Sequence, residues 1–419
     1  MTIFRFPPLR HAIKIWAVIV ASWLAANLLL ASCGNEDSTN VNDINKQTVL
    51  VFMPWTGNNA KDQGLYSNFQ QNLDSIEHAI VANKGYTGRL VVFLSTSAQT
   101  SSLYEVTYKS GTISHTILKT YDGTDYTTAF GISQIMSDVK ASAYALNYAM
   151  IVGGHGCGWT YAADWDTVAA TAKTRRATQD SPTTYPQTRF FGSSAPSTYS
   201  IDVETLAEGI SQAGVKLQYL LFDNCYMANI ETAYALRDAT NWLVASTSEV
   251  MAIGMPYASM WQYLGSSTPS YRSMVSSFHS FYASYSTPCG TLSAIDCRQM
   301  DALAALMLNI NNRYTLPDSL IDSLQVLDGF HTPLFYDLGD YVNHVCSNAS
   351  LLSDFDSQLK RTVPYFTTTD TLYSNLYDHP AYIAVKNFSG LTISDPSRNS
   401  VATKGKQKTA WWKATHAGD

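Results

Sequence analysis

Charged residues are scarce in this chain of 419 residues, and positive charge is in deficit. Only 14% of the residues are charged, 46% are hydrophobic, and the formal net charge is −6. Without a basic field the chain is poorly suited to hold a polyanion, which argues against a nucleic-acid partner. The hydrophobic fraction and the lack of any short repeat exclude disordered, collagen-like and coiled-coil proteins. The length predicts two or three domains, or one large domain with insertions.

Acidic residues are absent from residues 1–35, where three cations precede an uncharged, mostly apolar run of 18 residues. The run ends in small residues before Cys33. A basic start followed by a short apolar run is typical of a secretory signal, so we predict a signal peptide over 1–32. The alternative is an uncleaved transmembrane anchor, because 18 residues approach the minimum span of a bilayer. Residues 33–46 are rich in Asn, Asp, Ser and Thr and are predicted to form a flexible tether.

Cysteines are also few. Five follow Cys33, and this odd number leaves at least one thiol unpaired. No two of them have CxxC spacing, and no His/Cys cluster suggests zinc, so no metal site is predicted. Cys289 and Cys297 are close enough in sequence to form a small disulfide loop, but nothing in the sequence requires that pairing.

Apolar runs of strand length alternate with segments of helical spacing in the first part of the chain. The runs that we interpret as buried strands are 47–53, 89–94, 148–152, 217–222 and 242–246. Such an alternation predicts an α/β fold, with a mostly parallel sheet covered by helices on both faces. We assign this fold to residues 47–255, interrupted by a polar, aperiodic insert at 159–200. Residues 256–419 are expected to form a mixed helical and strand region packed on that domain.

The C-terminal tail carries four lysines around Trp411 and Trp412. A surface strand with solvated lysines is the preferred interpretation, and a binding segment is the alternative.

Two glycine- or cysteine-containing motifs directly follow two of the buried strands. Gly154-His155-Gly156 follows the third strand, and Asp223-x-Cys225 follows the fourth. In parallel sheets, ligands bind beyond the carboxyl ends of the strands, so both motifs are placed where chemistry occurs. Residues 226–239 are predicted to form a helix, and a cysteine just before a helix has its thiolate favoured by the helix N-terminus. A thiolate attacks acyl carbons, and a nearby histidine can protonate the departing amine. The backbone N–H groups of Gly156 and Cys225 are candidates for holding the resulting oxyanion.

Each motif alone has a simpler explanation. A cysteine at a strand end is often only a small buried hydrophobe, and a Gly-His-Gly segment is often only a turn. The occurrence of both motifs in this order, each after a buried strand, favours a Cys–His enzyme.

The same residues resemble the clostripain family of cysteine peptidases, which belongs to the caspase-like clan. The marks that carry the resemblance are Thr48-Val-Leu-Val-Phe-Met53, Gly154-His155-Gly156-x-Gly158-Trp159 and Leu220-Leu-Phe-Asp-x-Cys-x-Met-Ala-Asn-Ile-Glu231, with weaker marks at Ser389-Gly-Leu-Thr-Ile393 and Thr409-Ala-Trp411. The match is good over about residues 47–250. Cys157 departs from the motif, which usually has another small residue there. The segment after the fifth strand keeps few of the expected polar groups, so substrate choice is less secure than the chemistry.

The resemblance implies a role for each matching residue. Cys225 is expected to be the nucleophile and His155 the general acid and base. Asp223 is expected to line the primary specificity pocket and receive Lys or Arg, although a structural hydrogen bond is the alternative. Members are commonly cut in the insert between His and Cys, which here offers three basic sites, Lys173, Arg175 and Arg176. Some members use calcium, but no loop with ordered carboxylate spacing requires it, so no cofactor is predicted.

The end of the predicted signal, Leu30-Ala-Ser-Cys33, resembles a bacterial lipobox. It implies a lipid on Cys33 and a lipoprotein exported to the cell envelope of a Gram-negative bacterium, where protein or peptide substrates meet it. The leading function is thus a lipid-anchored endopeptidase that cuts after Arg or Lys. The alternatives are a peptidase of the same fold with non-basic specificity, and a non-catalytic lipoprotein that binds glycans.

Overall fold

The computed structural model describes residues 44–57, 64–165, 199–376 and 381–416. The chain divides into two units, residues 1–44 and 45–419, and the elements below all belong to the second. Within the described ranges, no helix combines the length and the apolar character needed to cross a bilayer.

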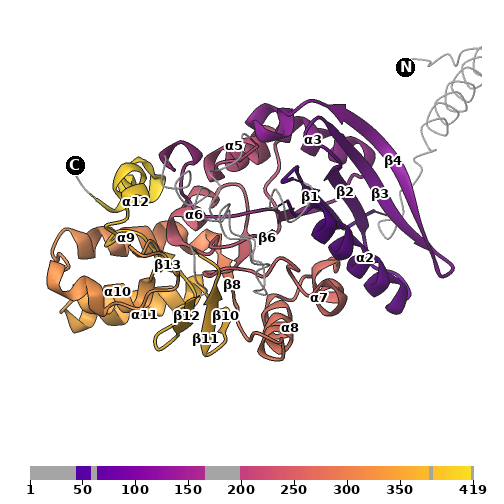
Figure 1. Cartoon of the computed structure of the whole chain (residues 1–419). Helices are drawn as coiled ribbons and strands as arrows, with labels where there is room; N and C mark the ends of the chain where they lie inside the picture. Colours follow the sequence, from indigo (N-terminus) through magenta and orange to yellow (C-terminus); the bar gives the residue numbers. More distant parts are fainter. Residues whose placement is uncertain (1–43, 58–63, 166–198, 377–380, 417–419) are drawn as a thin grey trace, which may run out of the picture. The chain divides into compact units, whose positions relative to one another are not determined.

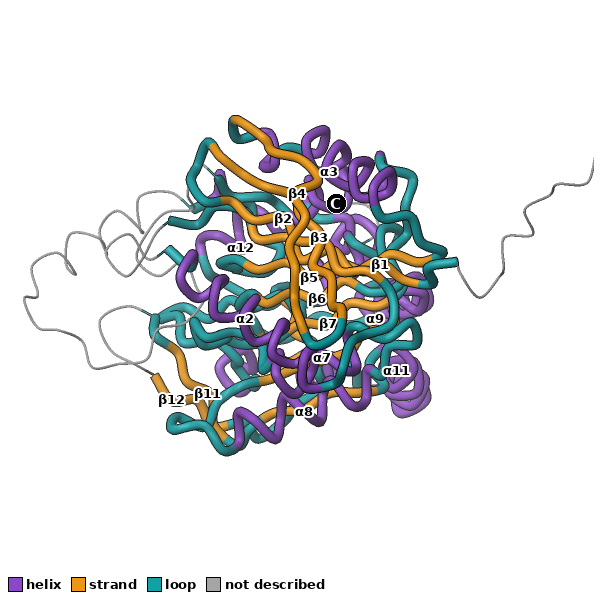
Figure 2. The backbone as a smooth tube through the Cα atoms, turned by 90° about the vertical axis from the view of Figure 1, so that its right-hand side faces the viewer, coloured by secondary structure: helices purple, strands orange, loops and turns teal. Residues whose placement is uncertain are grey.

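A nine-stranded sheet forms the centre of the second unit (Figures 1 and 2). In spatial order its strands are β10 (Tyr365–Thr368), β8 (Thr291–Asp296), β7 (Trp242–Ala245), β6 (Leu220–Asp223), β5 (Asn147–Gly153), β1 (Gln47–Met53), β2 (Arg89–Ser95), β3 (Thr100–Lys109) and β4 (Thr112–Asp122). The five strands from β7 to β2 run parallel, and they correspond to the five apolar runs of the sequence. Antiparallel pairs extend the sheet on both sides. The predicted α/β fold is therefore confirmed.

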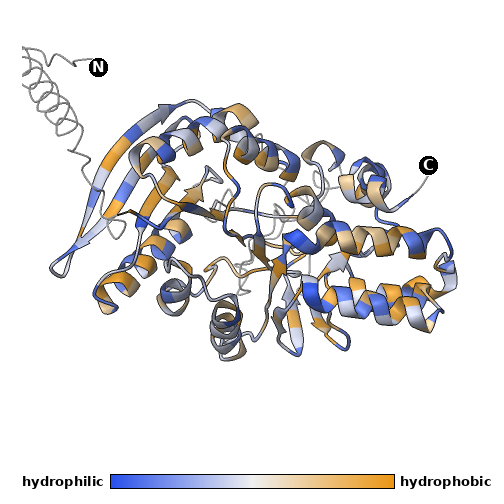
Figure 3. Cartoon of the chain, turned by 180° about the vertical axis from the view of Figure 1, so that it is seen from behind, coloured by the Kyte–Doolittle hydropathy of each residue, from blue (hydrophilic) through white to orange (hydrophobic). Residues whose placement is uncertain are grey.

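Helices cover both faces of this sheet because successive side chains of a strand point to opposite sides. In β1, Leu50 and Phe52 enter one core, whereas Val49 and Val51 enter the other. The first core is covered by α3 (Ala129–Ser142), α5 (Val203–Gln212), α6 (Ile230–Ala235), α9 (Met300–Asn311), α10 (Leu338–Val345), α11 (Ala349–Thr362) and α13 (Ala410–Thr415); the second is covered by α2 (Tyr66–Ala82), α7 (Tyr257–Leu264) and α8 (Tyr271–Ala283). In Figure 3 these helices carry both hydrophilic and hydrophobic residues, as expected for helices with one buried face.

Residues 256–419 share the cores of the sheet. Two of their strands, β8 and β10, continue it beyond β7. Two small ladders complete this part, one between β11 (Thr371–Ser374) and β12 (Ala381–Ala384), the other between β9 (Tyr336–Asp337) and β13 (Thr392–Ile393). The boundary proposed at 255 therefore does not separate two independent hydrophobic cores.

The expectation of a surface strand in the C-terminal tail is wrong. The tail forms α12 (Ser400–Gly405) and α13, and Trp411 is fully buried. Lys408 Nζ pairs with both carboxylate oxygens of Asp164, at 2.8 and 2.9 Å, at the start of the insert. Burial of the indole ring decides the outcome, because short helices can dock a tryptophan that an isolated surface strand would expose.

Candidate active site

The ends of β5 and β6 bring the two predicted catalytic residues to one edge of the sheet. These parallel strands are neighbours, with Gly153 in register with Asp223. His155 and Cys225 each follow two residues later, so they occupy equivalent positions beyond adjacent strand ends. Asn224 Nδ2 donates a hydrogen bond of 2.9 Å to the backbone oxygen of His155, which ties the two turns together.

Gly156 lies in close contact with the backbone of the neighbouring turn. A Cβ atom at this position would be 2.5 Å from Cys225 O and 3.1 Å from Cys225 N, which only glycine avoids. The close approach places the backbones of the two predicted oxyanion-binding residues side by side. Their role as hydrogen-bond donors to an oxyanion stays a prediction.

The thiol of Cys225 is fully buried. Its sulfur accepts a hydrogen bond of 3.2 Å from Val250 N and lies 3.6 Å from Val250 O, in the segment that follows β7.

The helix after Cys225 begins later than the sequence suggests. We expect it to start at Tyr226, with the thiol at its N-terminus, but α6 starts at Ile230, and Asn229 is its N-cap. Tyr226 instead has a left-handed backbone, with φ of 60°. The expectation that a helix N-terminus favours the thiolate is therefore wrong, because a strained turn separates the cysteine from the helix.

Asp223 is the last residue of β6, and its carboxylate is fully buried. One oxygen accepts from Met255 N at 3.1 Å, and the other accepts from the hydroxyl of Tyr257 at 2.8 Å. These two hydrogen bonds hold the segment after β7, residues 246–257, against the end of β6. Each carboxylate oxygen can accept more than one hydrogen bond, so the specificity role and the structural role are both compatible with this arrangement.

The other cysteines in the described residues are free and buried. Burial raises the pKa of the Cys157 thiol well above its ordinary value, which makes it a poor thiolate. Burial also raises the pKa values of Cys289 and Cys297 to about 12, and these two are not bridged.

Several predicted residues fall outside the described ranges, namely Cys33, Lys173, Arg175 and Arg176. Among the residues that are described, no group of three or more His, Cys, Asp or Glu side chains is arranged to hold a metal ion.

Glu249 and Val250 contact residues 225–226, the turn that carries the predicted nucleophile Cys225 and is called the nucleophile turn below. The sequence did not single them out for this contact. They lie 24 and 25 residues after Cys225; through tertiary packing of the segment that follows β7, Glu249 contacts Tyr226 and Val250 contacts Cys225. The only available signal was the Ser-Thr-Ser-Glu249 run directly after an apolar strand, which placed polar groups at the same edge of the sheet.

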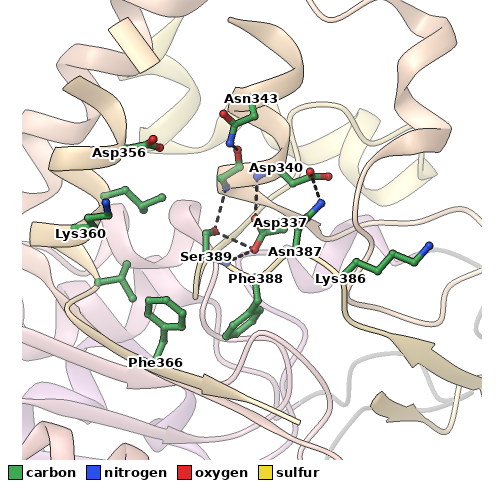
Figure 4. Close-up of a pocket in the computed structure, with 13 residues that line it drawn as sticks. Asp337, Asp340, Asn343, Asp356, Lys360, Phe366, Lys386, Asn387, Phe388 and Ser389 are labelled. Carbon is green, nitrogen blue, oxygen red and sulfur yellow. Dashed lines mark hydrogen bonds between the residues drawn. The ribbon is translucent and has the colours of Figure 1, made fainter. Parts of the chain in front are cut away.

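A separate surface pocket of about 380 Å³ lies between α10, α11, β10 and residues 386–389 (Figure 4). Asp337 accepts from Ser389 N at 2.7 Å and from its hydroxyl at 2.9 Å, while Asp340 accepts from Asn387 at 2.8 Å. These carboxylates hold residues 386–389 against α10. None of the predicted catalytic residues lines this pocket.

Comparison with known proteins identifies the class of this enzyme. The clostripain family model matches residues 55–379. A secreted C11 cysteine protease from Bacteroides thetaiotaomicron, "iotapain", is 42% identical and covers 89% of this chain and 99% of its own, with a TM-score of 0.78. A clostripain from the same species, in complex with the peptide inhibitor BTN-VLTK-AOMK, is 50% identical over 53% of this chain and 97% of its own, with a TM-score of 0.51.

An inactive zymogen C11 protease from Parabacteroides distasonis has the same fold at 22% identity, covering 89% of this chain and 99% of its own, with a TM-score of 0.72. No curated protein matches the chain. The fold and the family model together show that this chain belongs to the clostripain family. It is a cysteine peptidase, as the sequence motifs predicted.

Proposed function

We propose that this cysteine peptidase uses Cys225 as its nucleophile and His155 as its general acid and base. The observation that carries the proposal is the register of β5 and β6, which sets both residues two positions beyond paired strand ends. In the reaction, the Cys225 thiolate attacks the carbonyl carbon, and the imidazolium of His155 protonates the departing amine. Water then attacks the thioester, His155 takes its proton, and the acid product leaves with the thiol regenerated.

The proposed substrates are proteins and peptides cut internally after Lys or Arg. Asp223 supplies a buried negative charge two residues before the nucleophile, and a carboxylate suits an ammonium or guanidinium group. The inhibitor held by the relative that is 50% identical, BTN-VLTK-AOMK, has lysine as the last residue of its peptide. A non-basic specificity is the alternative on the same fold, and a glycan-binding lipoprotein finds no support in the family assignment.

We also propose that the protein is exported and anchored to the cell envelope by a lipid on Cys33. The basic start, the apolar run and Leu30-Ala-Ser-Cys33 support this placement. The similar "iotapain" is described as secreted. Cys33→Ala should leave the protein unprocessed or release it from the membrane fraction, whereas unchanged membrane association would favour the transmembrane anchor.

Activation by self-cleavage after Lys173, Arg175 or Arg176 completes the proposal. The insert that holds these residues begins directly after the His155 turn, and basic residues fit a pocket lined by Asp223. N-terminal sequencing of purified wild-type and Cys225→Ala proteins tests it. Two fragments from the wild type and one intact chain from the variant are expected, and identical cutting of both would point to a separate protease.

The nucleophile itself is tested by covalent labelling with a thiol-directed inhibitor and by cleavage of a panel of short fluorogenic peptides. Cys225→Ala should abolish both labelling and cleavage. Cys157→Ala is the matched control, because that thiol is also buried and lies near the predicted base. Loss of labelling in Cys157→Ala alone would overturn the assignment.

A further inference from the structure

The segment after β7 is bonded directly to the turn that carries the nucleophile. Tyr226 N donates to Ser248 O at 3.0 Å, so the two backbones run side by side. Two residues further, Val250 N donates to Cys225 Sγ at 3.2 Å. An N–H group aimed at a sulfur stabilises the thiolate relative to the thiol, because hydrogen bonding to the charged form favours it. Val250 O, to which the thiol donates over a longer distance of 3.6 Å, acts in the opposite direction.

The side chain of Glu249 anchors this segment at the point where it meets the sulfur. It is almost fully buried, and one carboxylate oxygen accepts from the hydroxyl of Tyr226 at 3.1 Å and from the hydroxyl of Ser374. Both of its oxygens also accept from Asn375 N, at 3.2 and 3.1 Å. Because Glu249 precedes Val250, these bonds fix the peptide unit whose N–H points at the sulfur.

Both the side chain and the backbone of Tyr226 are fixed by their surroundings. Its ring stacks on Phe335 with centroids 5.1 Å apart and an interplanar angle of 18°. Its backbone has φ of 60°, a region that residues other than glycine rarely adopt and that persists only when the surroundings enforce it. Burial raises the pKa of its hydroxyl, which therefore stays protonated and donates to Glu249. Since Tyr226 directly follows Cys225, its fixed backbone also orients the nucleophile.

We propose that Glu249 is a positioning residue for the nucleophile. Its carboxylate joins Tyr226, on the nucleophile turn, to the Val250 peptide, and so keeps the Val250 N–H on the Cys225 sulfur. The inference rests on the proposed role of Cys225 and adds to it the group that holds the thiolate in place.

The test compares Glu249→Gln and Tyr226→Phe with the wild type. In Glu249→Gln, one oxygen becomes an NH2 group, which cannot accept from Asn375 N or from the hydroxyls. We expect kcat to be lower by about 10-fold or more, with KM within about 3-fold. Loss of the Val250 N–H from the sulfur moves the acid limb of the pH profile of kcat/KM up, whereas loss of the Glu249 negative charge moves it down, so the net upward shift is expected to stay below about one pH unit. Tyr226→Phe removes the hydroxyl that donates to Glu249, leaves the carboxylate charge in place, and should shift the limb upward by less.

Tyr219→Phe is the matched control, because its hydroxyl is also buried and donates a hydrogen bond, to Leu264 O at 2.9 Å, away from Cys225. It should lose stability like Tyr226→Phe but keep the wild-type pH profile. The rate of alkylation of Cys225 by iodoacetamide, followed by peptide mapping from pH 5 to 10, gives a readout that does not need turnover. If Glu249→Gln fails to fold, Ser374→Ala takes its place, with the same direction of change expected.

An unshifted pH profile in both Glu249→Gln and Tyr226→Phe would overturn the proposal. So would a shift of equal size in Tyr219→Phe, which would show a general effect of stability. Failure of the underlying function gives a different result, since Cys225→Ala would then retain activity or labelling.

Discussion

At the scale of single residues, the two roles open to Asp223 differ in the kinetics that they predict. If its carboxylate receives the substrate's cation, Asp223→Asn should lower kcat/KM for Lys and Arg peptides by about 100-fold or more, because a charge-assisted bond is lost. For peptides with a neutral residue in place of Lys or Arg, kcat/KM should change by less than about 3-fold. Steady-state kinetics on matched peptide pairs measures the difference.

Asp328→Asn is the control for that experiment. Asp328 is also buried, and its carboxylate accepts from Phe330 N, Leu334 N and Phe335 N at 2.8, 2.9 and 2.6 Å. Its substitution should lower stability without changing the preference among peptides. A uniform loss on all peptides in Asp223→Asn, with a matching fall in Tm, would assign Asp223 to structure alone.

The contact between Gly156 and the nucleophile turn leads to a second prediction. Gly156→Ala places a methyl group 2.5 Å from Cys225 O, so the turn must shift, and a displacement of about 1 Å can cost about 100-fold in rate. Activity should fall by at least that factor. Gly111→Ala is the control, because this hairpin glycine has positive φ but nothing within 4 Å of the added carbon. It should cost stability and leave activity intact; equal activity losses would contradict the prediction.

At the scale of elements, the short helix α6 depends on a cap that also holds the nucleophile turn. Asn229 accepts from Thr232 N at 2.8 Å and donates to Tyr226 O at 2.7 Å. Asn229→Ala should lower the free energy of unfolding by about 2 kcal/mol, since it removes a cap and leaves a buried carbonyl without this donor. Activity should fall as well, because the turn that carries Cys225 loses its support.

The cap of α11 is the matched control. Asn348 accepts from Ser350 N and Leu351 N, both at 3.0 Å, on an exposed helix start. Asn348→Ala should cost about 1 kcal/mol and leave activity unchanged. Chemical denaturation and peptide cleavage, measured on both variants, separate the two outcomes. Equal activity in both would mean that the turn does not need Asn229.

The sequence predicted well those elements whose burial produces a recognisable pattern of apolar residues along the chain. The parallel strands are apolar on both faces, so continuous runs such as 47–53 identify them. In contrast, β10 and β11 have four residues each and carry no apolar run; β10 pairs with the distant β8, and β11 pairs with the nearby β12 outside the main sheet. The tail helices were missed because Trp411 is buried by tertiary packing.

The candidate site divides in the same way. Cys225 and His155 were located from sequence because each directly follows a strand, and strand ends share an edge. The late start of α6 and the left-handed backbone of Tyr226 were not predicted from sequence. They depend on the capping residue Asn229 and on hydrogen bonds to the segment after β7. Residues that act through contacts 23 or 25 positions away leave no local pattern, as Glu249 and Val250 illustrate.

At the scale of the whole molecule, a buried carboxylate makes stability depend on pH. Burial raises the pKa of Glu231 to about 8, and the neighbouring Asp395 adds to the rise. The folded protein therefore retains a proton that the unfolded chain releases above about pH 4.5, so stability falls as the pH rises from there to about 8. Glu231→Gln should raise Tm by about 1 to 3 °C at pH 8.5 and change it little at pH 5.

Thermal unfolding from pH 5 to 9 measures this dependence. Glu208→Gln is the control, because Glu208 lies on the exposed side of α5. It should leave the pH dependence of the wild type in place. A Glu231→Gln variant that keeps the wild-type slope would show that this carboxylate does not set it.

Burial of the tail also predicts a large stability effect. The ring of Trp411 is fully buried and lies edge-on to Tyr234, with centroids 5.7 Å apart. Trp411→Ala should lower the free energy of unfolding by about 3 to 5 kcal/mol. The adjacent Trp412 is only partly buried, so Trp412→Ala should cost less. Denaturant titration compares them, and equal costs would contradict this account of the tail.

The outer strand β4 shows how the sheet avoids self-association. It has 11 residues and an open edge, and Ile117 on it is 59% exposed, which is the kind of edge that recruits a further strand. His115 pairs with Glu77 of α2 at 2.6 Å, and Lys119 pairs with Asp138 of α3 at 2.8 Å, so polar side chains on each side of Ile117 fasten the strand to the helices on both faces. A β-bulge between Leu103 and Tyr104 interrupts its pairing with β3. An incoming strand therefore meets polar flanks and an irregular edge, which are features that oppose edge-to-edge aggregation at β4.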